Sequence, residues 1–256
     1  MSPLRAPAAA PPSGTDPFQQ RLSHYIALTD AERTSLAALT GARKRLKSGE
    51  VLVREGEPSD SLYVLRSGWM ASSMVLGDGA RQIVRFHHTG DLVNGTCLAW
   101  TRSAASLTAL TNAEVAPLPR RALTGLFQAQ PRLAALLHGL LTAETVVLSD
   151  RVASLGRTDG RARIATLLLE LWSRQRVVDR TVEASFELFL SQSQIADIVG
   201  LTKIHVNRLL KELETEGLIA REGRRLTLVQ PDRLAGITGF VDRHADLATD
   251  WFPPPV

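Results

Sequence analysis

The side chains with the clearest chemical potential are polar and basic residues between positions 203 and 211. They are Lys203, His205, Asn207, Arg208 and Lys211. Arginine can form two hydrogen bonds to guanine, asparagine can do so to adenine, and lysine can neutralise phosphates. Apolar residues alternate with them at helical spacing and predict a buried stripe: Val206, Leu209, Leu210 and Leu213. The opposite face of this helix is therefore suited to the major groove of DNA.

A second helix must hold that one in place, and the stretch 191–214 predicts a helix-turn-helix. Ser191 and Gln194 have the spacing of a capping box, which starts a helix of about residues 191–199. Gly200 can take the positive φ of a tight corner, and Thr202 can cap a second helix of about residues 203–214. The five apolar positions of such a motif hold Ile195, Val199, Leu201, Val206 and Leu209, with small Ala196 and Gly200 between them. This set favours DNA binding over a solvated helix hairpin.

A wing is predicted next, with strands at 218–220 and 225–229 around the turn Glu222-Gly223. Arg221, Arg224 and Arg225 surround its tip, where they can meet a phosphate backbone or simply aid solubility. Arg208 is the leading candidate for a contact to a base edge, followed by Asn207 and His205. The predicted DNA-binding residues are Gln192, Ser193, Thr202, Lys203, His205, Asn207, Arg208, Lys211 and Arg224.

Composition is that of an ordinary globular protein, and its 256 residues suit two domains and a connector. The net charge of +4 is compatible with nucleic acid and does not demand it. A single cysteine, Cys97, excludes an internal disulfide, disfavours an iron–sulfur cluster, and suggests a cytoplasmic protein. The proline-broken N-terminus, residues 1–17, is expected to be a disordered tail and not a signal peptide. No run approaches the length of an uncharged membrane span, so no membrane partner is expected.

The remaining chain predicts an α+β fold. Residues 18–39 are helical in pattern, with a new start near Thr29. Short strands with turn signals between 42 and 119 indicate an antiparallel sandwich or barrel. Helices are expected at 131–156 and from 160 to about 174, and a strand within 181–190. An amphipathic segment from Asp232 closes in a loose tail.

The helix expected at 131–156 is about 37 Å long at 1.5 Å per residue, longer than a small domain needs. Its wide apolar stripe includes Leu133, Leu137, Leu141 and Leu148, although Glu144 and Arg151 interrupt it. It is either a single buried core helix or a helix that pairs with the same helix of a second subunit. Dimerisation is favoured, because paired helix-turn-helix units need two-fold symmetry.

This order of parts resembles the CRP/FNR family of bacterial transcription regulators across about residues 18–240. The N-terminal resemblance rests on Gly49-Glu50, Glu55-Gly56-Glu57, residues 60–65, Gly68 and Gly90-Asp91. The C-terminal one rests on residues 195–202 and 206–211. It implies an antiparallel β-roll like a cyclic-nucleotide-binding domain, a long dimerisation helix, a C-terminal winged helix-turn-helix, and RNA polymerase as partner. The expected division is a tail at 1–17, a β-roll sensor domain at 18–130, a dimerisation helix at 131–156, a DNA-binding domain at 157–235 and a C-terminal tail at 236–256.

The chain also departs from that family. Cyclic-AMP-binding members carry a glutamate after the Gly-Asp turn and an arginine-serine pair downstream, whereas residues 92–98 hold no glutamate and Ala104-Ala105-Ser106 replaces the pair. The oxygen-sensing branch uses N-terminal cysteines, which are missing here. Cyclic AMP and an iron–sulfur cluster are therefore disfavoured, and no cofactor is predicted. Both branches have a glutamate before the arginine matched by Arg208, where this chain has Ile204 and His205. The familiar half-sites should therefore not apply.

Several residues are candidates for a sensor. An effector pocket is placed at Asn94, Gly95, Thr96, Cys97 and Ser106. Cys97 is read as a small buried residue more readily than as a redox switch. His87 and His88 point to opposite faces of a strand and are expected at the surface. His138 is expected to be a core or interface histidine. No motif for catalysis or for a metal site was found, so an enzyme is not predicted.

The sequence therefore predicts a cytoplasmic, homodimeric regulator that reads a partial palindrome. One alternative is a regulator without ligand, controlled by its own abundance. The other is a small-molecule-binding module whose C-terminal domain contacts protein. The predicted homodimeric regulator is also compatible with an unknown small-molecule effector.

Overall fold

The computed structural model describes residues 16–179 and 182–256, so most of the tail expected at 1–17 lies outside the described residues. The N-terminal region holds α1 (Pro17–Ser23), α2 (Asp30–Ala38), β1 (Lys44–Leu46), β2 (Val51–Val53), β3 (Ser61–Ser67), β4 (Met70–Val75), β5 (Arg81–His87), β6 (Leu92–Val93), the 3-10 helix η1 (Gly95–Leu98), β7 (Ser106–Ala109), β8 (Ala113–Pro119) and α3 (Ala122–Ala129). The long helix α4 (Pro131–Arg157) follows. The C-terminal region holds α5 (Gly160–Val178), β9 (Ser185–Glu187), α6 (Gln192–Val199), α7 (Lys203–Thr215), β10 (Ile219–Glu222), β11 (Arg225–Leu228) and α8 (Pro231–Thr238).

The N-terminal strands form two four-stranded antiparallel sheets, in the orders β1-β8-β3-β6 and β2-β7-β4-β5. One apolar core takes residues from both sheets, including Leu65 of β3, Met70 of β4 and Val115 of β8. Burying one face of each sheet against the other is how an antiparallel sandwich hides its apolar side. The predicted sandwich or barrel is confirmed.

Helices cover one side of this β-roll. Thr29 and Glu32 form the capping box that starts α2, with Thr29 N donating to Glu32 Oε2 at 2.8 Å and Glu32 N donating to Thr29 Oγ1 at 3.2 Å. The new helix start predicted near Thr29 is therefore confirmed. Residues from α1, α2, α3 and the first half of α4 pack with β3 and β8 in a second core, which includes Phe18, Leu62 and Leu133.

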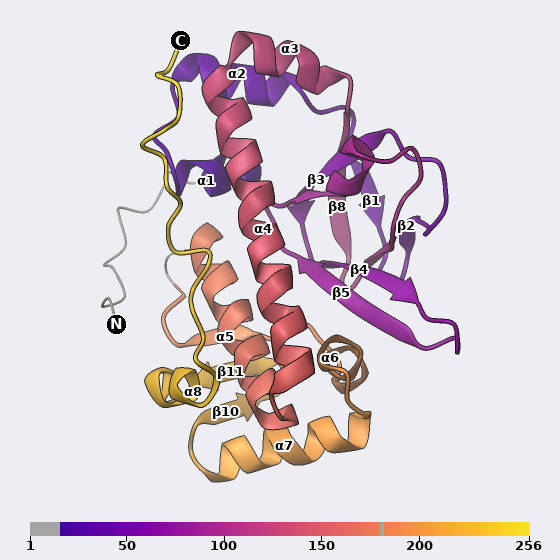
Figure 1. Cartoon of the computed structure of the whole chain (residues 1–256), viewed down its shortest axis with the longest axis vertical. Helices are drawn as coiled ribbons and strands as arrows, with labels where there is room; N and C mark the ends of the chain where they lie inside the picture. The colour runs from indigo at the N-terminus through magenta and orange to yellow at the C-terminus, as the bar shows by residue number, and fades with distance from the viewer. Residues whose placement is uncertain (1–15, 180–181) are drawn as a thin grey trace.

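The helix α4 runs most of the length of the molecule and connects its two regions (Figure 1). Its first half is well covered, whereas Val152 in its second half is 71% exposed. Of its most apolar 18-residue window, only 22% is buried. By length and composition α4 is long and apolar enough to cross a membrane, although Arg132, Glu144 and Asp150 interrupt its uncharged runs. Such a helix also fits a soluble protein in which its open apolar face receives a second helix.

The C-terminal region packs α5, α6, α7 and α8 around a three-stranded sheet in the order β10-β11-β9. Its core continues into the N-terminal region, because Trp69, Ile83 and Phe86 belong to the same apolar cluster as α5 to α7. Trp69 meets Phe189 edge to face at 5.4 Å between ring centroids. Gln82 Nε2 also donates to the carbonyl of Asp197 in α6 at 2.6 Å. The two regions therefore share one continuous core.

A buried ionic cluster joins the same two regions. Arg174 of α5 is 4% exposed and forms ion pairs with Asp91, in the turn before β6, and with Glu144 of α4. Arg21 of α1 contacts both carboxylates, and Arg85 of β5 lies 2.6 Å from Glu144. Burial lowers the pKa of Arg85 to about 10. Because each buried charge has opposite charges beside it, the cluster fixes α5 against α4 and the β-roll.

The segment after Gly239 packs back against α4, as the course of the chain toward its C-terminus shows (Figure 1). Asp242 accepts a hydrogen bond from Ser173 at 2.5 Å, and Arg243 pairs with Asp150 of α4 at 2.8 Å. Leu247 and Phe252 lie over Gly139, where a Cβ would come within 3.2 Å of Leu247. The amphipathic segment expected from Asp232 therefore packs on the rest of the protein, and the absent side chain at Gly139 leaves room for its apolar residues.

Candidate nucleic-acid interface

The corner between α6 and α7 has the geometry that the sequence predicts. Ser191 N donates to Gln194 Oε1 at 2.8 Å, and Gln194 N donates to Ser191 Oγ at 3.2 Å, which completes the capping box. Gly200 ends α6 with φ of 65° and ψ of 44°, a left-handed conformation that side chains disfavour. Thr202 then caps α7 by accepting from His205 N at 3.3 Å. These local interactions set the angle at which α7 leaves the domain.

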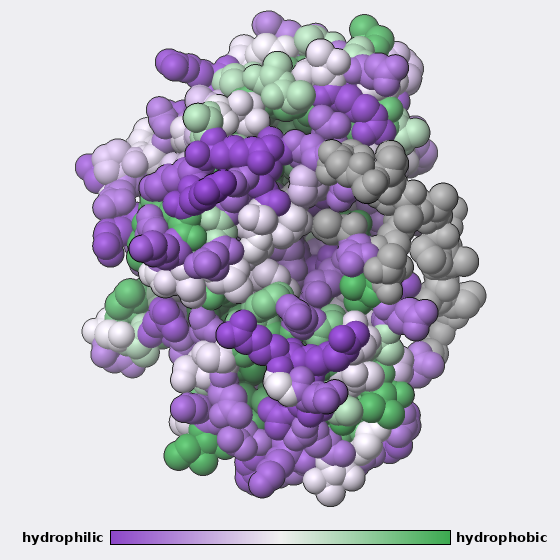
Figure 2. All heavy atoms as spheres, turned by 180° about the vertical axis from the view of Figure 1, so that it is seen from behind, coloured by the Kyte–Doolittle hydropathy of each residue, from purple (hydrophilic) through white to green (hydrophobic). Residues whose placement is uncertain are grey.

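The two faces of α7 separate as predicted. Its buried residues are Val206, Leu209, Leu210 and Leu213, which pack on α5 and α6. Its exposed residues include Lys203, Ile204, Asn207, Arg208 and Lys211. Seen from behind, the end of the molecule that carries α7 is covered mainly by hydrophilic residues (Figure 2). The outward face of α7 therefore presents donors and positive charge to solvent, where a DNA groove can reach them.

Arg208 is accessible and loosely oriented. Its side chain is 65% exposed, its Nη2 donates to His205 Nε2 at 3.0 Å, and its Nη1 lies 3.7 Å from Glu212 Oε1. An exposed pair at that distance contributes little to stability. The guanidinium can therefore exchange these partners for a base edge at small cost, while His205 keeps it near the start of α7.

A second contact joins α6 to α7 at the same surface. Asn207 Nδ2 donates to Gln192 Oε1 at 3.2 Å, so a predicted residue of α6 lies beside one of α7. Ser193, Thr202, Lys203 and Lys211 are also exposed. This places the predicted residues of the helix-turn-helix on one accessible end of the molecule, and their contact with DNA stays a prediction.

The prediction from sequence left out Ile204, which is 84% exposed on α7. An apolar side chain in that position can contact the methyl group of thymine. The available signal was its phase, because Ile204 falls outside the stripe formed by Val206, Leu209, Leu210 and Leu213.

The three arginines of the wing differ in their hydrogen-bond partners. Arg221 forms two hydrogen bonds to Glu214, at 2.8 and 2.7 Å, and these bonds lower the pKa of Glu214 and raise that of Arg221. Arg225 Nε donates to Ser185 Oγ at 2.9 Å. Arg224 is exposed beside the Gly223 turn. Of the three, Arg224 is the one that the structure leaves most available to a phosphate.

The residues predicted as an effector pocket are largely engaged in holding the β-roll together. Asn94 takes a left-handed conformation, and its Nδ2 donates to Ser59 Oγ at 2.7 Å and to the Ser61 carbonyl at 2.8 Å. Gly95 faces Leu141 of α4, and Ser106 Oγ accepts from Glu55 N at 3.0 Å. Thr96 lies in η1 beside the fully buried Cys97. The assignment of these five residues to an effector stays a prediction.

The candidate sensor residues differ in their burial and their contacts. Burial raises the pKa of the Cys97 thiol, which disfavours the reactive thiolate. The expectation that His87 and His88 lie at the surface was wrong, because they are only 2% and 4% exposed. His87 Nε2 lies 2.7 Å from Ser72 Oγ, and the His88 ring packs on Trp69 at 4.1 Å. They fill the junction of the two regions, where both faces of β5 are covered. His138 is exposed on α4.

Comparison with known proteins agrees with this architecture. Residues 43–130 match the family described as cyclic nucleotide-binding domain, and residues 162–237 match the Crp-like helix-turn-helix domain. The fumarate and nitrate reduction regulatory protein of Salmonella typhimurium is 27% identical over 212 residues, which are 83% of this chain and 84% of that protein. The transcriptional activator protein anr of Pseudomonas aeruginosa is 28% identical, over 84% of this chain and 87% of that protein.

The structure of FixK2 from Bradyrhizobium japonicum is similar too, with a TM-score of 0.69 and 27% identity over 78% of this chain and 98% of that one. The two family matches place a cyclic nucleotide-binding domain before a helix-turn-helix domain, and these two matches lie on either side of α4. The chain belongs to the CRP/FNR family of transcription regulators and carries its helix-turn-helix DNA-binding domain.

Proposed function

We propose that two copies of this chain pair through α4 and read a partial palindrome, with each α7 in one major groove and half-sites about one helical turn apart. The observation that carries this proposal is the outward face of α7. It presents Asn207, Arg208 and two lysines around an exposed Ile204, above a fully buried apolar stripe.

Each side chain has a role set by its chemistry and position. Arg208 is assigned a guanine edge, with His205 orienting its guanidinium. Asn207 is assigned an adenine edge, with Gln192 holding its amide. Phosphate contacts are assigned to the remaining predicted residues, which are Ser193, Thr202, Lys203, Lys211 and Arg224.

The second half of α4 supports the dimer. Thr145, Ser149 and Val152 recur at spacings of four and three residues, so they share one face, and all three are exposed. Val146 and Leu148 beside them are each 39% exposed. A matching helix from a second copy would cover this surface and place the two helix-turn-helix units about one two-fold axis. The domain limits that we propose are those expected from sequence: 18–130, 131–156, 157–235 and 236–256.

The groups that the family uses as effectors do not fit these residues in the usual way. A cysteine-ligated cluster needs more thiolates than the one cysteine of this chain can supply. The loop that follows the Gly90-Asp91 turn holds no glutamate, and Arg102 donates to the carbonyl of Gly56 at 2.8 Å. We propose a cytoplasmic regulator without either group and without catalytic activity, which acts on transcription through RNA polymerase.

The proposal is tested by selecting bound duplexes from a random DNA pool with the full chain at near-physiological salt. We expect an enriched two-fold motif, and we expect Arg208→Ala to lose preference at one base pair of each half-site, about 1–3 kcal/mol. Arg233→Ala, in α8 and away from α7, is the matched control and should select the wild-type motif. An unchanged motif with Arg208→Ala would remove that assignment, and enrichment of a single unpaired half-site would remove the dimer.

A further inference from the structure

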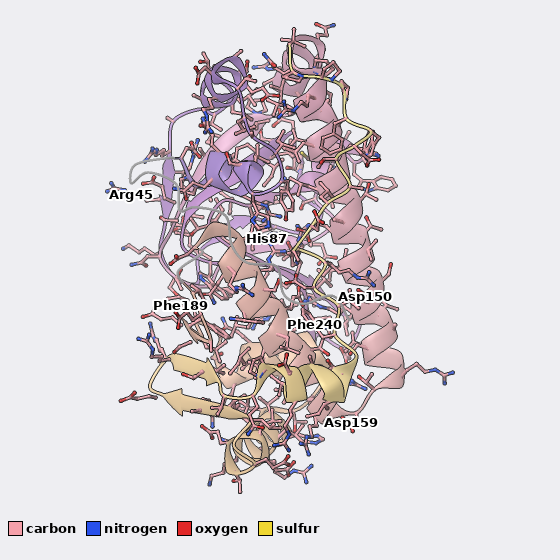
Figure 3. The ribbon with its side chains drawn as sticks, turned by 90° about the vertical axis from the view of Figure 1, so that its left-hand side faces the viewer. Arg45, His87, Asp150, Asp159, Phe189 and Phe240 are labelled. Carbon is pink, nitrogen blue, oxygen red and sulfur yellow. The ribbon has the colours of Figure 1, made fainter. Side chains whose placement is uncertain are left out.

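A cavity of about 350 Å³ lies behind α4, at the junction between the two regions of the molecule. Its walls come from the second half of α4, from α5, from the end of α6 and from residues 238–244 of the C-terminal segment. Figure 3 shows Asp150 of α4 and Phe240 of the C-terminal segment close together in this part of the molecule. The cavity lies outside the region predicted for an effector, and no residue of α7 or of the wing lines it.

The greater part of its wall is apolar. Val147 and Leu155 face it from α4, Leu167 from α5, Ile198 from α6 and Phe240 from the C-terminal segment. Its volume falls in the range of about 300–1,000 Å³ that is usual for small-molecule sites. An apolar wall of that size, with a few polar groups, is what a small organic ligand requires.

The charged residues of the cavity wall indicate which kind of ligand the cavity can bind. Four arginines and two carboxylates line the cavity. Arg151 is paired with Glu170 at 2.7 Å, and Arg243 is paired with Asp150 at 2.8 Å, which accounts for both carboxylates.

The other two arginines have no such partner. Arg163 donates only to backbone carbonyls, those of Thr158 and Val199. The side chain of Arg157 is exposed at the end of α4 and makes no hydrogen bond or ion pair with the other residues in 16–179 and 182–256. The cavity therefore carries two positive charges that no described carboxylate balances, beside a largely apolar wall.

We propose that this cavity binds a small organic anion, with its acidic group at Arg157 and Arg163 and its apolar body between Leu167 and Phe240. Hydrogen bonds between a guanidinium and an anion are among the stronger ones in proteins. Burial of the apolar body of the ligand against the apolar wall would also favour binding. A neutral compound of the same shape would leave both charges unmatched.

The cavity stays open when α4 pairs with a second copy. Val147, Arg151 and Ser154 face the cavity, whereas Thr145, Ser149 and Val152 lie nearly opposite them on the helix, which turns by 3.6 residues. Ala153, which also lines the cavity, lies beside Ser149 and marks the edge between the two faces. An occupant would touch α4, α5, α6 and the C-terminal segment together. It would thus stabilise the observed position of the helix-turn-helix against α4, and only this regulatory consequence rests on the proposed function.

Binding is tested without DNA, by titrating the full chain with anilinonaphthalene sulfonate, a small apolar anion, and with neutral phenylnaphthylamine. We expect saturable binding of the sulfonate and at least about tenfold weaker binding of the neutral dye. Arg157→Gln should weaken the sulfonate about tenfold, and Thr166→Phe, which fills the cavity, should abolish it. Arg121→Gln removes one exposed charge just before α3, away from the cavity, and should bind like the wild type.

Because Arg157 is exposed, Arg157→Gln keeps the test valid even if Thr166→Phe does not fold, which circular dichroism would show. Equal sulfonate affinity in the wild type, Arg157→Gln and Arg121→Gln would overturn the proposal. The regulatory consequence is tested on the selected duplex, where saturating sulfonate should change DNA affinity severalfold in the wild type and not in Arg157→Gln. The same change in both proteins would overturn that consequence, whereas failure to select any duplex would count against the DNA-binding proposal alone.

Discussion

Arg174 of α5 and Arg208 of α7 are the same residue type on two helices of one domain, and their surroundings are opposite. Arg174 is 4% exposed and lies between Asp91 and Glu144, which come from the turn before β6 and from α4. Arg208 is 65% exposed and has only His205 and a distant Glu212 beside it. A buried, paired arginine is committed to structure, whereas an exposed one with weak partners is free to bind. The two positions therefore predict opposite responses to the same substitution.

The largest contrast should come from replacing each arginine by methionine. Arg174→Met removes the cation between Asp91 and Glu144, and we expect the free energy of unfolding to fall by about 3–5 kcal/mol. Arg208→Met should change it by no more than about 0.5 kcal/mol. Urea denaturation followed by circular dichroism measures both. Equal stability in the two variants would break the comparison.

Acidification should weaken the same buried junction. Burial, the largest cause, lowers the pKa values of His87, His88 and His244 well below 6.5, so these histidines stay neutral in the folded protein. The unfolded chain binds protons near pH 6.5, so stability is highest above that pH. Below that pH, the free energy of unfolding should fall by up to about 1.4 kcal/mol per pH unit for each of these histidines.

Glu144 acts in the same direction at lower pH. Burial raises its pKa, yet Arg174, Arg85 and Arg21 together hold it well below 4.5. Its contribution to stability is therefore present above about pH 4.5 and is lost only below that value. Urea denaturation at about pH 7.5, 6.5 and 5.5 measures the effect of the histidines alone, because Glu144 acts only at lower pH. In His88→Phe, the slope of the free energy of unfolding against pH should be smaller by the contribution of one proton. A wild-type free energy that does not change with pH would contradict the assignment of these histidines as buried and neutral.

The cap of α6 offers an intermediate case at the DNA-binding end. Ser191→Ala removes one hydrogen bond of the capping box and should lower the free energy of unfolding by about 1 kcal/mol. Ser193→Ala, which changes an exposed serine two residues later in the same turn, is the control. If Ser191→Ala costs as much as Arg174→Met, the DNA-binding end is as tightly coupled to the core as the buried cluster, and the contrast disappears.

Ile204 should show the smallest effect and the cleanest separation of binding from folding. Because its side chain is 84% exposed, Ile204→Ser should leave the urea midpoint unchanged. If Ile204 meets an apolar group in the groove, affinity for the selected duplex should fall by about 0.8 kcal/mol or more, the value of one buried methylene. Fluorescence anisotropy with the labelled duplex measures it. A lower midpoint with unchanged affinity would place Ile204 in the structure instead.

Much of the helix-turn-helix could be predicted from its residues, because the signals that build it are local. Ser191 and Gln194 are three residues apart, Gly200 supplies its own backbone conformation, and the buried stripe of α7 repeats every three or four residues. The outward face, including Arg208 and Asn207, follows from that stripe by geometry alone.

The junction between the two regions could not be predicted in the same way. Arg174 meets Asp91 across 83 residues of sequence, and nothing near either one indicates that pairing. His87 and His88 were placed at the surface because alternation along a strand puts one face outward, but the C-terminal region covers that face as well.

The amino-acid sequence by itself determined the family, through motifs spread over both regions. It also determined the two faces of α7 and the corner that joins it to α6, since these two features depend on residues within a few positions of each other. Tertiary structure alone decided which arginines are buried, how the C-terminal segment returns to Gly139, and where a cavity opens behind α4. The reason is physical: burial and charge pairing depend on which distant segments meet, and that is settled only when the whole core packs.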